Sequence, residues 1–190
     1  MKQALILHGT AASPEANWFR WLERSLIQNG YTVWLPQLPH AEAPNTDTYN
    51  TFIFTQSDFK INHETILIGH SSGAVEILSL LQHLPANLMV SDVYLVSAFK
   101  NNLDWPALDG LFNEPYDYDA IRKKATSITL IHSDNDPYVP LDHAQFLADK
   151  LSANLRLLPG QGHFNTEQSA DYREFPKLLE LILHNDKDQS

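Results

Sequence analysis

The chain has 190 residues, of which 43% are hydrophobic and 11% aromatic, and its formal net charge is -10. A chain of this size is expected to form one domain whose folding buries roughly 70% of the unfolded surface. The absence of cysteine excludes disulfides, thiolate metal sites and cysteine nucleophiles. The acidic balance argues against nucleic-acid binding, because that affinity comes largely from lysine and arginine neutralising phosphates.

The apolar run at residues 4–7 is too short for a signal peptide. No apolar stretch approaches the ~18 residues that a membrane span requires. We therefore expect a cytoplasmic protein with no membrane span. A protein partner is compatible with this composition but is not indicated by it.

Short apolar runs recur along the chain and predict β-strands. Leu5-Ile6-Leu7 and Ile66-Leu67-Ile68 are continuously apolar, which is typical of strands covered on both faces. Such strands predict a mostly parallel sheet, here with about six strands, flanked by helices. The predicted strands are residues 3–8, 31–35, 65–70, 92–97, 127–132 and 154–158.

Helical patterns lie between these strands. The first begins at Ser13-Pro14-Glu15, where a cap precedes a proline and an acidic residue, and it ends at Gly30. Its Trp18 and Trp21 lie on an apolar stripe, which we interpret as core packing. The alternation of strands and helices predicts one α/β domain over residues 1–184 and a tail over residues 185–190. Further helices are predicted at residues 47–59, 72–84, 141–151 and 171–183.

Two segments, residues 36–44 and 101–118, interrupt this alternation with prolines, aspartates and aromatic residues. Each is flanked by predicted core elements, so neither is a linker between domains. We predict loops or short lid-like pieces over one edge of the sheet, where open α/β folds hold their sites.

The residues Gly69-His70-Ser71-Ser72-Gly73 join a predicted strand to a predicted helix. A Gly-x-Ser-x-Gly pattern between a strand and a helix is typical of a nucleophile elbow. The glycines leave room for strand and helix to approach, and the turn presents Ser71 at the carboxyl end of the strand. No lysine follows as in a phosphate-binding P-loop, so we predict that Ser71 is a nucleophile.

A serine nucleophile needs a base, and in this kind of fold the chain order is serine, acid, histidine. The last predicted strand runs into Gly160-Gln161-Gly162-His163, which places His163 in a loop beyond the end of the strand. His143 lies within a predicted helix instead, and His184 lies at the end of another. His163 is therefore the predicted base.

The acid should follow the preceding strand, where the loop contains both Asp134 and Asp136. Asp136 is favoured because an Asp-x-x-Val-Pro pattern closes the loop before the next helix. Asp134 remains the alternative, although its carboxylate could instead make an Asx-type turn with nearby backbone.

Two backbone N–H groups are the predicted oxyanion hole. One belongs to Ser72, directly after the nucleophile, and the other to Thr10, in the loop after the first strand. Gly9 allows the chain to bend close to a substrate carbonyl there.

Five short motifs carry a resemblance that covers nearly the whole chain. They are His8-Gly9 with Ser13, Trp18-Phe19-x-Trp21-Leu22, the Gly69 to Gly73 segment, Asp136-Pro137 before Val139-Pro140, and Gly162-His163-Phe164. Their combination resembles the small serine hydrolases that include YdeN-like bacterial proteins and retinoblastoma-binding protein 9. The resemblance implies an α/β-hydrolase fold with Ser71, Asp136 and His163 as the catalytic triad. It also favours Asp136 over Asp134, because the acid in that family directly precedes the position of Pro137.

The expected reaction is hydrolysis of a carboxylic ester with a small or short-chain acyl group, through an acyl-enzyme and without a cofactor. The resemblance also implies aminopeptidase-like cleavage as an alternative, so an amide substrate stays open. Side chains that follow strand ends or lie in the 101–118 segment could contact substrate, and each is at least as compatible with core or lid packing. They are Phe99, Trp105, Tyr138 and Phe164.

Two other classes of function fit the sequence less well. A hydrolase-fold binding module with little turnover would not need Ser71, Asp136 and His163 together. A metallohydrolase would need histidines at ligand spacing, and the sequence contains no His-Glu-x-x-His motif. We therefore expect an enzyme with no metal site.

Overall fold

The computed structural model describes residues 1–56 and 58–188. Its centre is a 6-stranded sheet in the order β2-β1-β3-β4-β5-β6, in which every neighbouring pair is parallel. The predicted parallel sheet is confirmed, and each predicted strand overlaps an observed one. The strands are β1 (Gln3–Leu7), β2 (Thr32–Trp34), β3 (Thr65–His70), β4 (Val90–Val96), β5 (Ala125–His132) and β6 (Asn154–Leu157).

Both faces of the sheet are covered, as the continuously apolar strands predicted. Every residue of β3 is buried. In β1, Leu5 and Leu7 pack into one core cluster, whereas Ala4 and Ile6 pack into another. Successive side chains of a strand point to opposite faces, so the two clusters lie on the two sides of the sheet.

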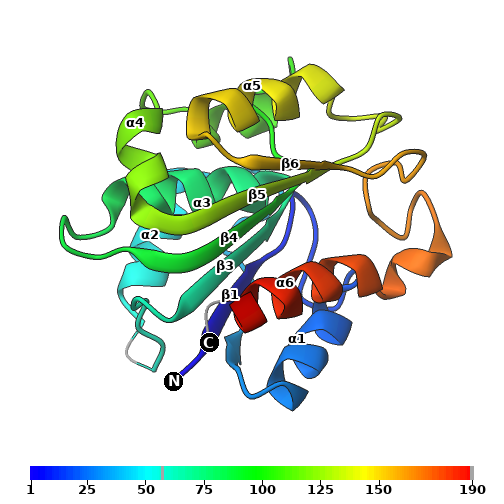
Figure 1. Ribbon diagram of the computed structural model, residues 1–190. Helices are drawn as coiled ribbons and strands as arrows, with labels where there is room; N and C mark the ends of the chain where they lie inside the picture. The colour runs from blue at the N-terminus through cyan, green and yellow to red at the C-terminus, as the bar shows by residue number, and fades with distance from the viewer. Residues whose placement is uncertain (57, 189–190) are drawn as a thin grey trace.

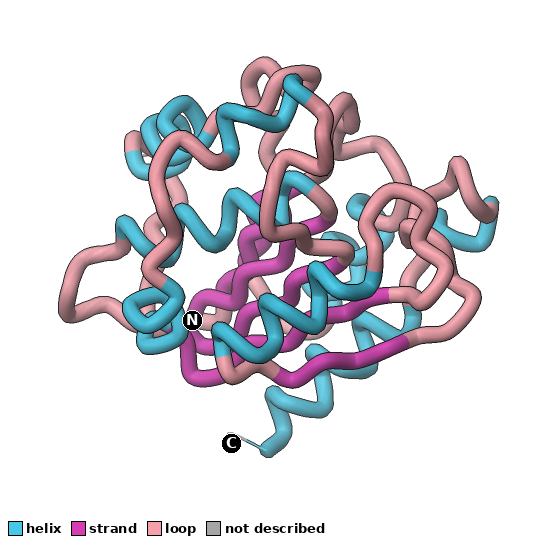
Figure 2. Tube along the Cα trace, turned by 90° about the horizontal axis from the view of Figure 1, so that it is seen from above, coloured by secondary structure: helices cyan, strands magenta, loops and turns pink. Residues whose placement is uncertain are grey.

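The helices form one layer on each face. Helices α1 (Phe19–Gln28) and α6 (Pro176–Asp188) lie together on one side, drawn in blue and red in Figure 1. Seen from above, the strands run side by side with helices and loops around them (Figure 2). The chain is therefore a single three-layered α/β domain. The other face carries α2 (Thr46–Phe54), α3 (Ser72–His83), α4 (Tyr118–Ile121) and α5 (Leu141–Leu151).

Helix α1 begins later than the predicted start at Ser13. Asn17, just before it, has a φ of 50°, in the left-handed region that does not continue a helix. The Asn17 side chain instead accepts a hydrogen bond from the Thr166 backbone N–H at 3.0 Å. The cap and proline pattern at residues 13–15 therefore precedes a series of turns, not a helix. Trp18 is fully buried, as predicted.

The start of α6 is also displaced from the predicted residue 171. A short 3-10 helix, η3 (Ala170–Arg173), comes first, and Glu174 is then extended at φ -135° and ψ 156°. Helix α6 begins at Pro176, whose missing N–H is not needed in a first turn. It runs on to Asp188, so residues 185–188 of the predicted tail are helical, and residues 189–190 lie outside the described residues.

The two irregular segments differ from each other. Residues 36–44 contain no helix or strand, as predicted. Residues 101–118 contain the 3-10 helix η1 (Pro106–Leu111), which the sequence analysis missed. Leu108 and Leu111 of η1 are buried against Val75 of α3, so this segment is packed onto the domain. Helix α2 ends at Phe54, short of its predicted end at residue 59.

The strand order reverses between β1 and β3, because β2 lies on one side of β1 and β3 on the other. In open parallel sheets, ligands bind beyond the carboxyl ends of the strands at such a point. Thr10 lies in the loop after β1, and Ser71 follows β3 directly. The topology thus brings these two sequence motifs to one place.

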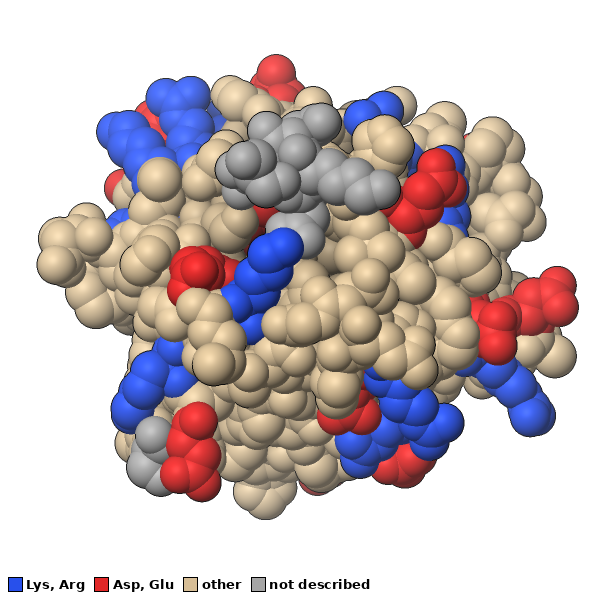
Figure 3. All heavy atoms as spheres, turned by 60° about the horizontal axis from the view of Figure 1, so that its bottom comes forward, with Lys and Arg blue, Asp and Glu red and all other residues tan. Residues whose placement is uncertain are grey.

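On the face drawn in Figure 3, basic side chains form several small groups, many of them beside acidic side chains, and not one extended basic area. Among the described residues, no helix is both long enough and apolar enough to cross a membrane.

Candidate active site

Ser71 occupies the turn between β3 and α3. Its backbone adopts φ 56° and ψ -123°, a conformation that costs a non-glycine residue ~1–3 kcal/mol. The flanking glycines are needed for space. A Cβ on Gly69 would lie 2.5 Å from the Gly73 carbonyl oxygen, and one on Gly73 would lie 2.5 Å from that of His8. The elbow therefore holds a strained serine where strand and helix touch, as its glycine pattern predicted.

Asp136 and His163 form a buried pair. His163 Nδ1 lies 2.8 Å from Asp136 Oδ2, and their side chains are 7% and 0% exposed. Asp136 Oδ1 also accepts the backbone N–H groups of Tyr138 and Val139, at 2.9 and 3.0 Å. Ser97 Oγ donates to Asp136 Oδ2 at 2.8 Å.

These contacts set the charge of Asp136. Burial by itself raises the pKa of the carboxyl group. The hydrogen bond and charge of His163, together with the N–H donors of Val139 and Tyr138, outweigh burial and hold the pKa below its usual value. Asp136 is therefore an anion at neutral pH, as required of a group that orients an imidazole and stabilises its protonated form.

Asp134 has a different role from Asp136. Its Oδ1 accepts the Gly160 backbone N–H at 2.8 Å, so the expected Asx-type turn with nearby backbone is not what it forms. Ser133 Oγ accepts from Gln161 N, and Asn135 Oδ1 accepts from Gly162 N, each at 2.8 Å. We call Ser133, Asp134 and Asn135 the loop clasp. It ties the loop after β5 to the loop that carries His163.

The loop clasp was missed by the sequence analysis. The available signal was a run of short polar side chains directly after a predicted strand. Such side chains readily accept hydrogen bonds from backbone N–H groups. Their partners, however, lie in a loop more than twenty positions away in the sequence.

The elbow and the His163 loop meet through His70, the residue before Ser71. His70 Nε2 donates to the His163 backbone oxygen at 2.8 Å, and the two rings lie 4.8 Å apart. The β1 loop also reaches the elbow, since a Cβ on Gly9 would lie 3.1 Å from Ser71 Cβ. Among the described residues, Ser71 Oγ has no hydrogen-bond partner. Nucleophile–base hydrogen bonds are often long in unliganded sites and tighten with substrate.

Three buried histidines brace the three loops of the site. Each is at or just after a strand end and donates a ring N–H to a backbone carbonyl: His8 to Gly9, His70 to His163 and His132 to Val139, at 3.0, 2.8 and 2.9 Å. Leu38 N donates to His8 Nε2 at 3.0 Å, which fixes the tautomer that carries its proton on Nδ1.

Burial disfavours the charged form of all three bracing histidines and lowers each pKa, that of His70 to about 3. They are therefore neutral at neutral pH and act as hydrogen-bond donors, not as bases. The sequence analysis did not identify this role, because a histidine at the end of a strand gives no indication of which carbonyl it will meet.

The two predicted oxyanion donors lie at the switch point. Ser72 is the first residue of α3, so its N–H belongs to the positive end of that helix. Thr10 is half-buried in the β1 loop. Within the described residues, neither backbone N–H donates to a protein acceptor. Both are available to a negatively charged oxygen.

The four predicted substrate-binding residues separate into two groups. Phe99 and Phe164 are 1% and 0% exposed and pack in the core, so they cannot line an open pocket. Trp105 and Tyr138 are 50% and 45% exposed. The Tyr138 ring meets the His163 ring edge-on, with 5.1 Å between centroids. Of these two exposed residues, Tyr138 contacts the Asp136–His163 pair.

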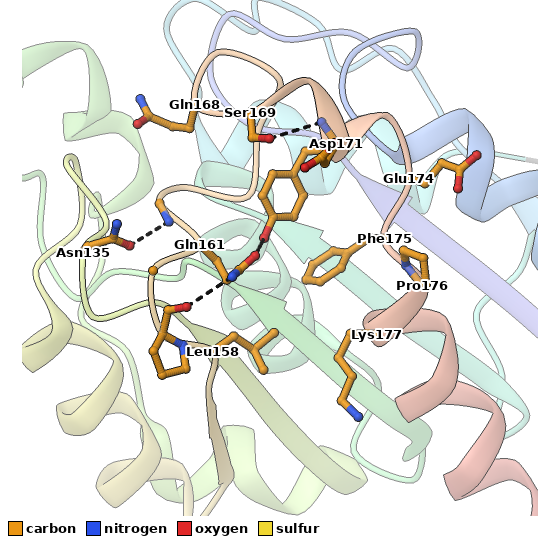
Figure 4. Close-up of a pocket in the computed structure, with 14 residues that line it drawn as sticks. Asn135, Leu158, Gln161, Gln168, Ser169, Asp171, Glu174, Phe175, Pro176 and Lys177 are labelled. Carbon is orange, nitrogen blue, oxygen red and sulfur yellow. Dashed lines mark hydrogen bonds between the residues drawn. The ribbon is translucent and has the colours of Figure 1, made fainter.

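A groove of about 720 Å³ lies behind the His163 loop (Figure 4). Within it, the Tyr172 hydroxyl donates to Gln161 Oε1 at 2.6 Å, and Asn135 accepts from Gly162 at its edge. Ser71, Asp136 and His163 do not line it. Among the described residues, no three side chains of the kinds that ligate metals converge on one point.

The chain is similar to known proteins over almost its whole length. Residues 4–184 match the serine hydrolase family. The chain belongs to that family. It is 30% identical to the YdeN protein of Bacillus subtilis over 95% of this chain and 94% of that one. It is 26% identical to the serine hydrolase RBBP9 of Rattus norvegicus, over 95% of both chains.

The crystal structure of the B. subtilis ydeN gene product superimposes with a TM-score of 0.89, covering 98% of this chain and 100% of that one at 26% identity. Est1E from Butyrivibrio proteoclasticus matches with a TM-score of 0.70 over 98% of this chain and 88% of that one. At 15% identity, Est1E shows a shared fold only. The serine hydrolase described here thus has the predicted α/β-hydrolase fold.

Proposed function

We propose that this serine hydrolase cleaves carboxylic esters with small or short acyl groups, using Ser71 as nucleophile, His163 as base and Asp136 as the orienting acid. The observation that carries the proposal is the buried 2.8 Å contact between Asp136 and His163, in a loop held against the strained Ser71 elbow by His70. A structural ion pair alone would not account for the strained serine beside it.

The reaction follows from these groups. Ser71 Oγ attacks the ester carbonyl carbon while His163 Nε2 takes its proton, and Asp136 stabilises the resulting imidazolium. The N–H groups of Thr10 and Ser72 hold the oxyanion. His163 then gives the proton to the departing alcohol, which leaves an acyl group on Ser71. A water molecule, deprotonated by His163, attacks the acyl carbon. The bond to Ser71 Oγ then breaks as His163 returns the proton to Oγ, which releases the carboxylic acid and restores Ser71.

The arrangement favours small substrates. Among the predicted pocket residues, Phe99 and Phe164 are enclosed in the core, and the 101–118 segment is packed onto α3 through Leu108 and Leu111. The described groove of about 720 Å³ lies behind the His163 loop, and Ser71 does not line it. The substrate is therefore proposed to sit on an open surface above the elbow, which provides little enclosed apolar volume for a long acyl chain.

A fluorophosphonate probe and a substrate series test the proposal. The wild type should be labelled and Ser71→Ala should not, because the probe reacts with an activated serine. Nitrophenyl esters of increasing acyl length should give the highest kcat/KM for the shortest chains. Absence of labelling would disprove the serine mechanism. Rapid cleavage of aminoacyl amides with no ester turnover would show that the enzyme is an amidase and not an esterase.

A further inference from the structure

Tyr138 lies two residues after Asp136, on the surface beside His163. Its side chain is 45% exposed, although its ring meets His163 edge-on at 5.1 Å and an interplanar angle of 78°. His163 also contacts the His70 ring, which is fully enclosed. The imidazole therefore touches one buried ring, from the last residue of β3, and one exposed ring, from the loop after β5.

The Tyr138 hydroxyl donates to Glu167 Oε1 at 2.6 Å. Glu167 lies four residues after His163, so this hydrogen bond joins the loop of the acid to the loop of the base. Hydrogen bonds from a hydroxyl to a carboxylate are short and stronger than those between neutral groups. We call the pair the Tyr138–Glu167 bridge.

The chain around Glu167 is fixed. Thr166 donates its backbone N–H and its Oγ1 hydroxyl to Asn17 Oδ1, at 3.0 and 3.1 Å. Gln168 donates its backbone N–H to Asn165 Oδ1 at 3.1 Å. Glu167 is thus held between two anchored residues, and the bridge can transmit that constraint to the Tyr138 ring.

We propose that the Tyr138–Glu167 bridge positions His163 for proton transfer by holding the Tyr138 ring against the imidazole. The inference rests on the proposed function, because it takes His163 to be the base. Asp136 fixes the ring only through Nδ1, and the loop clasp fixes the neighbouring backbone on the side of Gly160 to Gly162. The bridge adds a further constraint, through the exposed Tyr138 ring that meets the imidazole edge-on.

A positioning role differs measurably from a substrate-binding role. A side chain that only binds substrate changes KM with kcat unchanged, whereas one that orients the base changes kcat. Tyr138→Phe keeps the ring and removes only the hydroxyl that reaches Glu167. Glu167→Gln keeps an oxygen acceptor and removes the charge, whereas Glu167→Ala removes both.

The test measures kcat and KM for these variants on the best ester of the substrate series. Loss of one hydrogen bond should lower kcat by about 3- to 10-fold in Tyr138→Phe and in Glu167→Ala, with KM unchanged. Glu167→Gln should retain most of the wild-type kcat. The double variant Tyr138→Phe with Glu167→Ala should lose no more than either single variant, because both remove the same bond.

Two control variants make the same chemical changes elsewhere. Tyr31→Phe removes a phenol before β2, at the amino-terminal edge of the sheet, and Glu180→Gln removes an exposed carboxylate of α6 that pairs with Lys177. Both should keep the wild-type kcat. Thermal unfolding should show the bridge variants to be folded, since both side chains are largely exposed.

Three results would overturn the inference. They are a wild-type kcat in Tyr138→Phe, a rise in KM with kcat unchanged, and a loss of kcat in the double variant equal to the product of the two single losses. Fluorophosphonate labelling separates this failure from failure of the proposed function. If the wild type is labelled and Ser71→Ala is not, the mechanism stands and only the bridge is wrong. If the wild type is not labelled, the mechanism itself fails.

Discussion

His70 Nε2 donates a hydrogen bond to the His163 backbone oxygen at 2.8 Å, so the residue before the proposed nucleophile holds the loop of the proposed base. Nucleophile and base are ninety-two positions apart in the sequence. The distance between these two side chains in space depends on the hydrogen bond from the neutral, buried His70 imidazole as well as on the sheet. The contact therefore fixes the position of the elbow relative to the loop of the proposed base.

We expect His70→Leu to impair both stability and turnover. The leucine leaves a buried carbonyl oxygen without its donor, which should reduce the free energy of unfolding by about 1–3 kcal/mol. The freed loop should lower kcat by about 10-fold or more, since small displacements of catalytic groups are costly. His70→Gln offers an amide donor and should recover part of both losses. Equal urea midpoints and equal kcat for the two variants would rule out this role.

The two aspartates of the β5 loop should differ in kcat. Asp136→Asn should lower it by about 10⁴-fold, because the asparagine no longer selects the correct tautomer of His163. Asp134→Ala removes one hydrogen bond to Gly160 and should cost about 10-fold or less. Steady-state kinetics with one ester substrate is sufficient. The reverse order of effects would identify Asp134 as the acid.

The protein should lose stability in mild acid. Burial lowers the pKa of His8, His70 and His132 from 6.5 in the unfolded chain, for His70 to about 3. Between these values the unfolded state binds more protons than the folded state. These three histidines therefore do not reduce the free energy of unfolding above pH 6.5. The free energy of unfolding decreases as the pH falls through that value.

Urea unfolding from about pH 8 to about pH 4 checks this expectation. His70→Gln should show a shallower loss than the wild type, because one of the depressed histidines is gone. Identical pH dependence in the two proteins would mean that His70 is not the group responsible.

Glu76 should weaken the protein at alkaline pH. It is completely buried in α3, and neither carboxylate oxygen has a hydrogen-bond partner among the described residues. Burial, with a smaller contribution from Asp47, raises its pKa well above the usual 4.5. The folded state then holds a proton that the unfolded state releases, so stability falls as the pH rises above 4.5.

Glu76→Met should remove this dependence and raise the free energy of unfolding near neutral pH by about 1–3 kcal/mol, because an unpaired polar group leaves the core. Urea titrations at about pH 6 and about pH 9 measure the change. Glu180→Gln, on the surface of α6, is the control and should behave like the wild type. A destabilised Glu76→Met would indicate that Glu76 has a partner in solution.

The fold could be predicted from sequence because its signals are local. All three proposed catalytic residues were also predicted, although for the acid the sequence favoured Asp136 and left Asp134 open. Continuously apolar runs indicate strands covered on both faces, and Gly69 and Gly73 mark the contact of strand and helix. Ser71 is fixed by that motif. His163 follows from chain order and from the loop after the last strand. The exact helix starts were less predictable, because Asn17 and Glu174 take conformations set by distant contacts or by neighbouring turns.

The partners of polar side chains were decided only by the tertiary structure. Asp134 and Asp136 lie in one loop, and the sequence favoured Asp136 without showing what either carboxylate contacts. In the structure one accepts from Gly160 and the other from His163. The same holds for the His70 contact with the His163 backbone and for the Tyr138–Glu167 bridge. A sequence pattern specifies the local backbone and which face is apolar, whereas a hydrogen bond across more than twenty positions requires both loops to be in place. The sequence by itself therefore determined the sheet, the elbow and the order of the proposed triad, and the packing of the loops decided which groups meet there.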